Sequence, residues 1–220
     1  MKRQSTAIIY KAQQRGHFEN EQQRLLSTFN FGTYHAENRE PFGSLSVLND
    51  EVLAPGFSIT RSIQEGTSAL IIPLTGGIKV THETTEFESF PDEALILPAG
   101  EISIKNPYEA ELVNFLYIEL NTGTSGYQNI GFKLDTKNTL LPFIKLEAVK
   151  GYIGIFEGRQ EAFYTLQPGH GLFVFIINGA FETEGRLLEE RDALALWNTN
   201  EAEIEALSNN AALLLFEVKI

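Results

Sequence analysis

The sequence predicts an all-β protein built from two tandem β-barrels, and three observations lead to this prediction. Short runs rich in Val, Ile, Leu, Phe and Thr recur along the 220 residues, and Gly, Pro and Asn separate them at intervals of roughly 8 to 12 residues. The second half of the chain repeats features of the first half. The composition, 43% hydrophobic and 21% charged, is that of a folded globular protein.

The stretch from Phe57 to Leu120 contains the strands expected for the first barrel. They are the runs at 57–64, 68–74, 78–82, 92–100, 101–104 and 111–120, with a polar loop between the third and the fourth. A short barrel of this kind either fills with side chains or holds one small ligand. Three earlier segments are also predicted to be extended, at 6–11, at 25–34, where Phe29 and Phe31 alternate around Asn30, and at 43–49.

The second barrel is predicted from an internal repeat in the sequence. Asn178-Gly179 and the residues after it parallel Gly76-Gly77, residues 192–196 parallel 92–97, and each half closes with an apolar strand. The most linker-like segment is Asn121–Gly126. We therefore expect an N-terminal barrel at 1–122, a bridge at 123–150 and a C-terminal barrel at 151–220.

Composition excludes several classes of function. The chain has 17 basic and 29 acidic residues, a net charge of -12, so no direct binding to nucleic acid is expected. It has no cysteine, which excludes disulfides and thiolate chemistry. No run approaches the ~20 apolar residues of a membrane span, and the N-terminus lacks the apolar core of a signal peptide. The expected location is cytoplasmic, without a membrane partner.

Several linked motifs near the N-terminus resemble the opening segment of the pirin family. They are Arg15-Gly16-His17, residues 28–34 (TFNFGTY), residues 42–50 (FGSLSVLND) and Ala54-Pro55-Gly56. The resemblance implies two tandem jelly-roll-like cupin barrels, a bicupin. It also implies relatives that include quercetinase-type dioxygenases and transcription co-regulators, which act through other proteins.

In pirins, an early barrel strand supplies a His-x-His pair and a later strand supplies a His and a Glu, which together hold one iron or similar ion. When this chain is aligned with that pattern, the first two positions fall on Ser62 and Gln64, and the later two fall on Lys105 and Pro107. None of these side chains replaces imidazole or carboxylate at a transition metal. We therefore expect a degenerate site without a metal cofactor, and iron or another divalent metal only if the alignment is misplaced.

The candidate cavity residues are Ser62, Gln64, His82 and Lys105. His82 shares a strand face with Ile78 and Val80, by the period-2 alternation of a strand, so it is expected to face the barrel. It is interpreted either as a structural hydrogen-bonding residue or as a catalytic base beside Glu83. Whether Lys105 or Ile104 points inward is open from the sequence.

Three hypotheses for function follow. The favoured one is a pirin-like protein that has lost the metal centre and acts as a non-catalytic small-molecule-binding or regulatory protein-interaction module. The first alternative is a metal-dependent quercetin 2,3-dioxygenase. The second alternative is a metal-free cupin isomerase or epimerase that uses His82. The partners expected are therefore a protein or a small organic ligand.

Overall fold

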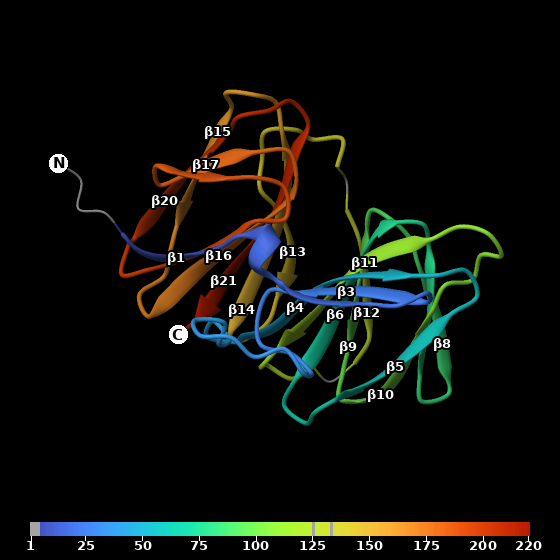
Figure 1. The fold of residues 1–220 in the computed structure, drawn as a ribbon. Helices are drawn as coiled ribbons and strands as arrows, with labels where there is room; N and C mark the ends of the chain where they lie inside the picture. Colours follow the sequence, from blue (N-terminus) through green and yellow to red (C-terminus); the bar gives the residue numbers. More distant parts are fainter. Residues whose placement is uncertain (1–4, 125, 133) are drawn as a thin grey trace. The chain divides into compact units, whose positions relative to one another are not determined.

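The computed structural model describes residues 5–124, 126–132 and 134–220, and nearly all its regular structure is β-strand (Figure 1). The short 3-10 helix η1 (Ala12–Gln14) is the helical element of the described residues. No helix within those ranges is long and apolar enough to cross a membrane. The prediction of an all-β fold is confirmed.

The chain divides into two compact units. One unit, called here the first barrel, comprises residues 15–41 and 45–132. The other, the second barrel, comprises residues 1–14, 42–44 and 133–220. Each unit contains one large and one four-stranded antiparallel sheet.

In the first barrel, the larger sheet has seven strands. Their order is β12 (Gln128–Gly131), β9 (Glu93–Leu97), β6 (Ser68–Thr75), β11 (Val113–Leu120), β4 (Leu45–Leu53), β3 (Gln23–Ser27) and β2 (Gly16–Glu19). The smaller sheet has the order β5 (Ser58–Ile63), β10 (Gly100–Lys105), β7 (Ile78–His82) and β8 (Thr85–Ser89). Strands β5, β6, β7, β9, β10 and β11 overlap the six runs predicted between Phe57 and Leu120, whose β-branched and apolar residues are typical of strands. Strand β8 lies in the segment predicted to be a polar loop, because only one of its residues is apolar.

The core of the first barrel lies between its two sheets. Along β7, buried and more exposed residues alternate, so Ile78, Val80 and His82 point inward, as predicted. The opposite sheet contributes Ile71, Phe115 and Tyr117 to the same apolar cluster. Alternate residues of each strand therefore line the interior, which is the usual consequence of strand pleating.

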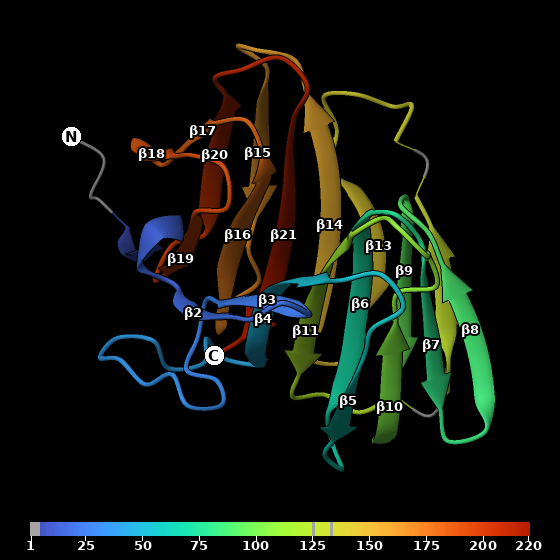
Figure 2. The same ribbon diagram turned by 45° about the vertical axis from the view of Figure 1, so that its right-hand side comes forward.

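In the second barrel, the larger sheet has six strands. Their order is β1 (Thr6–Tyr10), β19 (Ala193–Trp197), β16 (His170–Asn178), β21 (Ala211–Lys219), β14 (Val149–Phe156) and β13 (Leu141–Lys145). Figure 2 shows β16, β21 and β14 side by side. The smaller sheet has the order β15 (Glu161–Thr165), β20 (Glu201–Ala206), β17 (Phe181–Thr183) and β18 (Arg186–Leu188).

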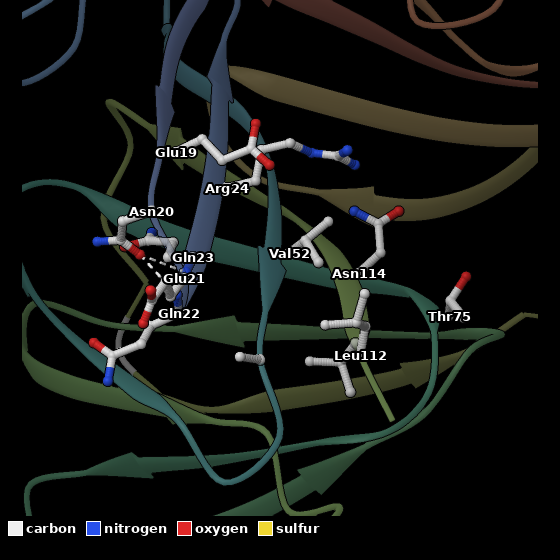
Figure 3. Close-up of a pocket in the computed structure, with 12 residues that line it drawn as sticks. Glu19, Asn20, Glu21, Gln22, Gln23, Arg24, Val52, Thr75, Leu112 and Asn114 are labelled. Carbon is white, nitrogen blue, oxygen red and sulfur yellow. Dashed lines mark hydrogen bonds between the residues drawn. The ribbon is translucent and has the colours of Figure 1, made fainter. Parts of the chain in front are cut away.

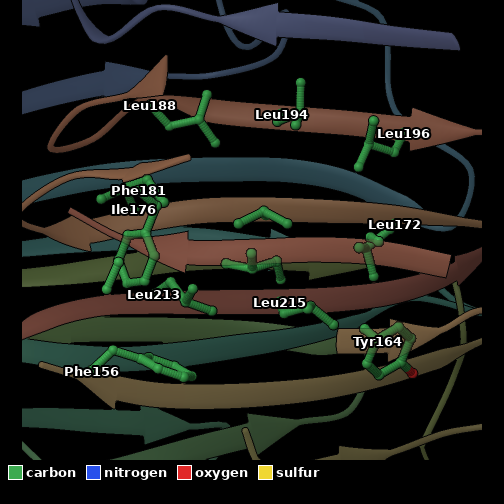
Figure 4. Packing of buried hydrophobic residues seen from close by; sticks show 14 of the residues in the cluster. Phe156, Tyr164, Leu172, Ile176, Phe181, Leu188, Leu194, Leu196, Leu213 and Leu215 are labelled. Atoms are coloured by element: carbon green, nitrogen blue, oxygen red, sulfur yellow. The ribbon is translucent and has the colours of Figure 1, made fainter. Parts of the chain in front are cut away.

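The interior of the second barrel is filled by apolar side chains from both of its sheets (Figure 4). Phe156 and Phe181, from opposite sheets, meet edge to face with ring centroids 5.9 Å apart. Leu213 and Leu215 are fully buried in the same cluster. This is the filled-barrel outcome rather than the ligand-holding one.

The domain division differs from the predicted one at both ends of the first barrel. The N-terminal strand β1 pairs with β19, from Thr6 opposite Trp197 to Tyr10 opposite Ala193, and so belongs to the second barrel. The expected bridge at 123–150 is divided, because β12 pairs with β9 of the first barrel and β13 pairs with β14 of the second. Local patterns do not reveal such long-range pairings, which explains the difference.

Candidate functional site

The interior of the first barrel is polar at one end of the smaller sheet. Along β5, Ile59 and Ile63 are buried, and alternation places Arg61 on the same inward face. In the neighbouring strand β10, Ile102 lies opposite Arg61 and Ile104 lies opposite Ile59. Arg61 is therefore a charged side chain on an otherwise aliphatic inner face.

Arg61 is held by a buried carboxylate from the larger sheet. Its Nη2 lies 3.1 Å and 3.3 Å from the two oxygens of Glu51 on β4, and Gln23 Nε2 donates a further hydrogen bond of 2.9 Å to Glu51. The side chain of Glu51 has no exposed surface, whereas that of Arg61 is 20% exposed. The pair thus lies at the boundary between the barrel interior and a solvent-accessible space.

Aromatic rings fix the position of the guanidinium group. The Cζ atom of Arg61 lies 5.5 Å from the ring centroid of Phe31 and 5.9 Å from that of Tyr117. Both distances are within the range of a cation–π contact. Burial raises the pKa of the Tyr117 hydroxyl, and the nearby Glu119 carboxylate, which accepts its hydrogen bond at 2.7 Å, raises it further. Tyr117 is therefore a neutral neighbour of the Arg61 guanidinium group.

A pocket of about 480 Å³ opens above Arg61, and we call it the Arg61 pocket. Its walls come from β2, from the inward face of β3 and from the loop at 31–34. Leu25 and Ser27 are buried in it, whereas His17 and Phe18 are exposed at its mouth. Gly16 lets the walls meet, because a Cβ atom there would lie 2.4 Å from the ring of Tyr34.

The structure corrects three of the four predicted cavity residues. Ser62 and Gln64 are exposed, since the inward positions of β5 are the odd-numbered ones, and Lys105 is exposed while Ile104 is buried. Pro107 is exposed as well. A shift of one position along a strand moves a side chain to the opposite face. The alignment by motif spacing was out of phase with the pleat of β5, which places Arg61 inside.

His82, the fourth predicted residue, faces inward and is buried, with both ring nitrogens near partners. Its Nε2 lies 3.1 Å from the carbonyl oxygen of Ala99, and its Nδ1 lies 3.5 Å from the hydroxyl of Tyr127. A carbonyl only accepts, so Nε2 carries the proton and Nδ1 is the acceptor. Glu83, its expected catalytic neighbour, is exposed. These contacts favour a structural role for His82 over a catalytic one.

The other histidines lie apart from this interior. His17 is exposed and contacts Glu19 at 2.9 Å, His35 is exposed, and Nδ1 of His170 lies 3.2 Å from the carbonyl oxygen of Pro168 in the second barrel. Throughout the described ranges, no group of three or more His, Cys, Asp or Glu side chains could hold a metal ion.

The residues on the inner faces of β5 and β10 do not fit the iron centre that the pirin resemblance implies. A guanidinium group has no lone pair to offer a metal, and isoleucine has no donor atom. The carboxylate nearest to them, Glu51, is already bonded to Arg61 and Gln23. Transition-metal centres of this type need several imidazole or carboxylate ligands directed at one point.

A second pocket, of about 330 Å³, lies beside the turn between β2 and β3 (Figure 3). Figure 3 shows Asn20 and its neighbours on one side and Val52, Leu112 and Asn114 on the other. The Oδ1 atom of Asn20 accepts hydrogen bonds of 2.8 and 2.9 Å from the backbone of Gln22 and Gln23. The Asn20 side chain thus stabilises the turn. No histidine is among the described residues that line this pocket.

Sequence reasoning missed Arg61, Glu51 and Ser27. A signal for Arg61 was present, because Ile59 and Ile63 flank it at a spacing of two and predict that it shares their face. Glu51 and Ser27 carry no comparable local signal. Their roles depend on the pairing of β3 with β4, which places Leu25 opposite Glu51 and Ser27 opposite Asn49.

Comparison with known proteins supports this description of the fold. The bacterial pirin YhhW of Escherichia coli, solved in complex with nickel(II), superimposes with a TM-score of 0.86 at 19% identity, over 97% of this chain and 99% of that one. YhaK of Escherichia coli gives 0.71 at 18% identity, over 95% of each chain. A quercetin 2,3-dioxygenase from Acinetobacter baumannii gives 0.71 at 11% identity, over 97% of this chain and 79% of that one.

The family comparison concerns the second barrel. No curated protein shows a significant sequence match to this chain. Residues 147–218 match the model of the quercetinase C-terminal cupin domain. Together with the pirin fold of the whole chain, this match confirms the resemblance drawn from the N-terminal motifs. The chain thus has the two-barrel cupin fold seen in bacterial pirins, and its residues 147–218 are similar to the quercetinase C-terminal cupin domain.

Proposed function

We propose that this protein is a pirin-like bicupin whose first barrel has lost the metal centre and binds a small organic molecule without transforming it. The observation that carries the proposal is the Arg61–Glu51 ion pair, which occupies the inner face of the strand to which the family pattern assigns two metal-binding histidines. A guanidinium group at this position offers no lone pair to a metal cation. The site thereby acquires a different preference, for groups that accept hydrogen bonds.

The shape of the first barrel supports binding rather than scaffolding alone. The Arg61 pocket, at about 480 Å³, lies within the range of small-molecule sites. The second barrel, in contrast, is filled by its own aromatic and aliphatic side chains. We propose that the first barrel binds the ligand and that the second barrel supports the structure.

Elemental analysis tests the proposal most directly. The protein is purified without a metal-binding tag, and its metal content is measured before and after incubation with ferrous iron, manganese, nickel and zinc. We expect far less than one ion per chain in every case. One tightly held ion per chain would overturn the proposal, because it would show that the chain has metal ligands that the alignment missed.

A metal-dependent quercetinase is the competing proposal, because a quercetin 2,3-dioxygenase shares the fold and the C-terminal domain matches a quercetinase model. Iron-supplemented protein is incubated with quercetin and oxygen, and loss of the flavonol absorbance is followed. Turnover that depends on added metal would favour this alternative. We expect no turnover, because the inner face around Arg61 offers too few side chains that can bind a metal ion.

A further inference from the structure

We infer that the Arg61 pocket binds a small aromatic carboxylate, with the carboxylate group directed at Arg61 and Ser27 and the ring packed against the aromatic walls. This inference rests on the proposed metal-free binding function and names its ligand class. It is carried by three features of the pocket: its charge, its unpartnered polar atoms and its aromatic lining.

The charge of the lining favours an anion. Among the described residues that line the pocket, Arg61 is the one with a permanent charge, although the chain as a whole carries a net charge of -12. Glu51, which bonds to Arg61, is not among the described residues that line the pocket. A ligand entering the pocket therefore meets a guanidinium group and no carboxylate, in a protein whose general surface repels anions.

The unpartnered polar atoms call for an acceptor. The hydroxyl of Ser27 is fully buried and has no hydrogen-bond partner among the described residues, and the same holds for Nε of Arg61. Nη2 of Arg61 is engaged by both oxygens of Glu51, and Nη1 donates to the carbonyl oxygen of Thr60 at 3.4 Å, so Nε is the guanidinium nitrogen that still needs an acceptor. Buried polar groups are nearly always hydrogen-bonded, so atoms of this kind call for an explanation. Carboxylate oxygens satisfy donors of both types, and a guanidinium group binds them particularly well.

The walls favour a planar ring. Phe31 and Tyr34 form one side of the pocket, Leu25 lies deeper, and Phe18, 51% exposed, lies at the mouth. Aromatic side chains prefer offset-stacked or edge-to-face contacts with other rings. The pocket volume exceeds that of a single substituted benzene ring, so a benzoate is small enough to enter it.

Calorimetric titration with benzoate tests the inference, with benzamide and cyclohexanecarboxylate as probes that lack the charge and the ring respectively. We expect saturable binding of benzoate, and binding about tenfold or more weaker for benzamide, because benzamide lacks the negative charge and the second acceptor oxygen that pair with a guanidinium group. Cyclohexanecarboxylate should also bind more weakly than benzoate. Equal affinity for benzoate and benzamide would overturn the assignment of an anion.

Two serine variants separate binding from folding. Ser27→Ala should weaken benzoate binding about three- to tenfold, because one hydrogen bond to the ligand is lost, and it should leave thermal stability unchanged because the hydroxyl has no partner in the protein. Ser89→Ala is the matched control, since its hydroxyl is also buried and unpartnered but Ser89 does not line the pocket. Unchanged affinity in Ser27→Ala would overturn the location of the site.

The titration is performed on chelator-treated protein whose metal content is measured in the same sample, so that two failures remain distinguishable. An ion that survives the chelator at one per chain would contradict the proposed function, whatever benzoate does. Metal-free, folded wild-type protein that binds neither benzoate nor cyclohexanecarboxylate would overturn the ligand class alone. Arg61→Lys provides a further check, because it keeps the charge but loses the planar fork, and benzoate affinity should fall.

Discussion

Inside the first barrel, Nη2 of Arg61 on β5 lies within 3.3 Å of both carboxylate oxygens of Glu51 on β4. This ion pair joins the two sheets of the barrel, because β5 belongs to the smaller sheet and β4 to the larger. Gln23, on the neighbouring strand β3, donates to the same carboxylate. The pair therefore links the two sheets, and its Arg61 side chain lines the proposed binding site.

Glu51→Gln should destabilise the first barrel by an amount near the lower end of the about 3–5 kcal/mol that is usual when one partner of a buried ion pair is removed. The lower end is expected because 20% of the Arg61 side chain reaches solvent. Urea unfolding followed by circular dichroism measures the change. Glu88→Gln is the control, since the Lys79–Glu88 pair is about half exposed and should contribute less than about 1 kcal/mol.

The pH dependence of stability should reveal the protonation of Glu51. Burial raises the pKa of its carboxyl group, although the charge and hydrogen bonds of Arg61 oppose this effect. The folded protein therefore holds a proton that the unfolded chain has released, and stability falls as pH rises from the unfolded pKa of 4.5 through the higher folded pKa. Unfolding free energies of wild type and Glu51→Gln, compared across this window, should show the fall only in the wild type.

Glu217 in the second barrel should have the opposite pH dependence. Burial alone would raise its pKa, but hydrogen bonds from Lys150, the Gln167 backbone and Tyr164 outweigh burial and lower it. The stability that Glu217 contributes is therefore present above pH 4.5 and is lost as pH falls through its folded pKa. Fluorescence of Trp197, the single tryptophan, follows unfolding of this barrel. An equally steep acid transition in Glu217→Gln would contradict the prediction.

Gly100→Ala should displace His82 and destabilise the first barrel by about 1–3 kcal/mol. The glycine has a φ of 138°, and a Cβ atom there would lie 2.7 Å from Nε2 of His82. Chemical unfolding measures the loss. Gly56→Ala is a control for backbone strain alone, because its φ is also positive but no atom lies within 4 Å. Adding His82→Ala to Gly100→Ala should recover part of the loss, and a strictly additive double variant would contradict the steric explanation.

Lys11→Met should destabilise the second barrel by about 1–3 kcal/mol, because it leaves a buried carboxylate without its cation. The ammonium group of Lys11 bonds to Asp192, whose side chain is 3% exposed, and the pKa of Lys11 is raised chiefly by this hydrogen bond. Thermal unfolding followed by Trp197 fluorescence measures the effect. Lys137→Met is the control, since its ion pair with Glu157 is about 40% exposed at both side chains and should contribute little.

The sequence was sufficient for most strands of the first barrel, because turn residues and β-branched runs are local signals, but it did not predict the more polar strands β2 and β8. It was insufficient to decide which residues of β5 point into the barrel. Motif spacing placed Ser62 inside, whereas the alternation of the apolar residues Ile59 and Ile63 placed Arg61 inside. It was also insufficient for the pairings that create the site. Ser27 and Glu51 acquire their positions only from the register between β3 and β4, which involves residues far apart in sequence.

The pairing of β1 with β19 has a consequence for synthesis on the ribosome. Residues 6–10 are made first, yet their partners at 193–197 are made almost last, after the whole first barrel has emerged. During that interval, the unpaired strand exposes Tyr10, which is buried in the folded barrel, and Ile8, which is partly buried there. Exposed strands of this kind are sites of intermolecular pairing. At high expression, β1 of one nascent chain can therefore complete the sheet of another, and exchanged dimers should appear among the products of rapid refolding.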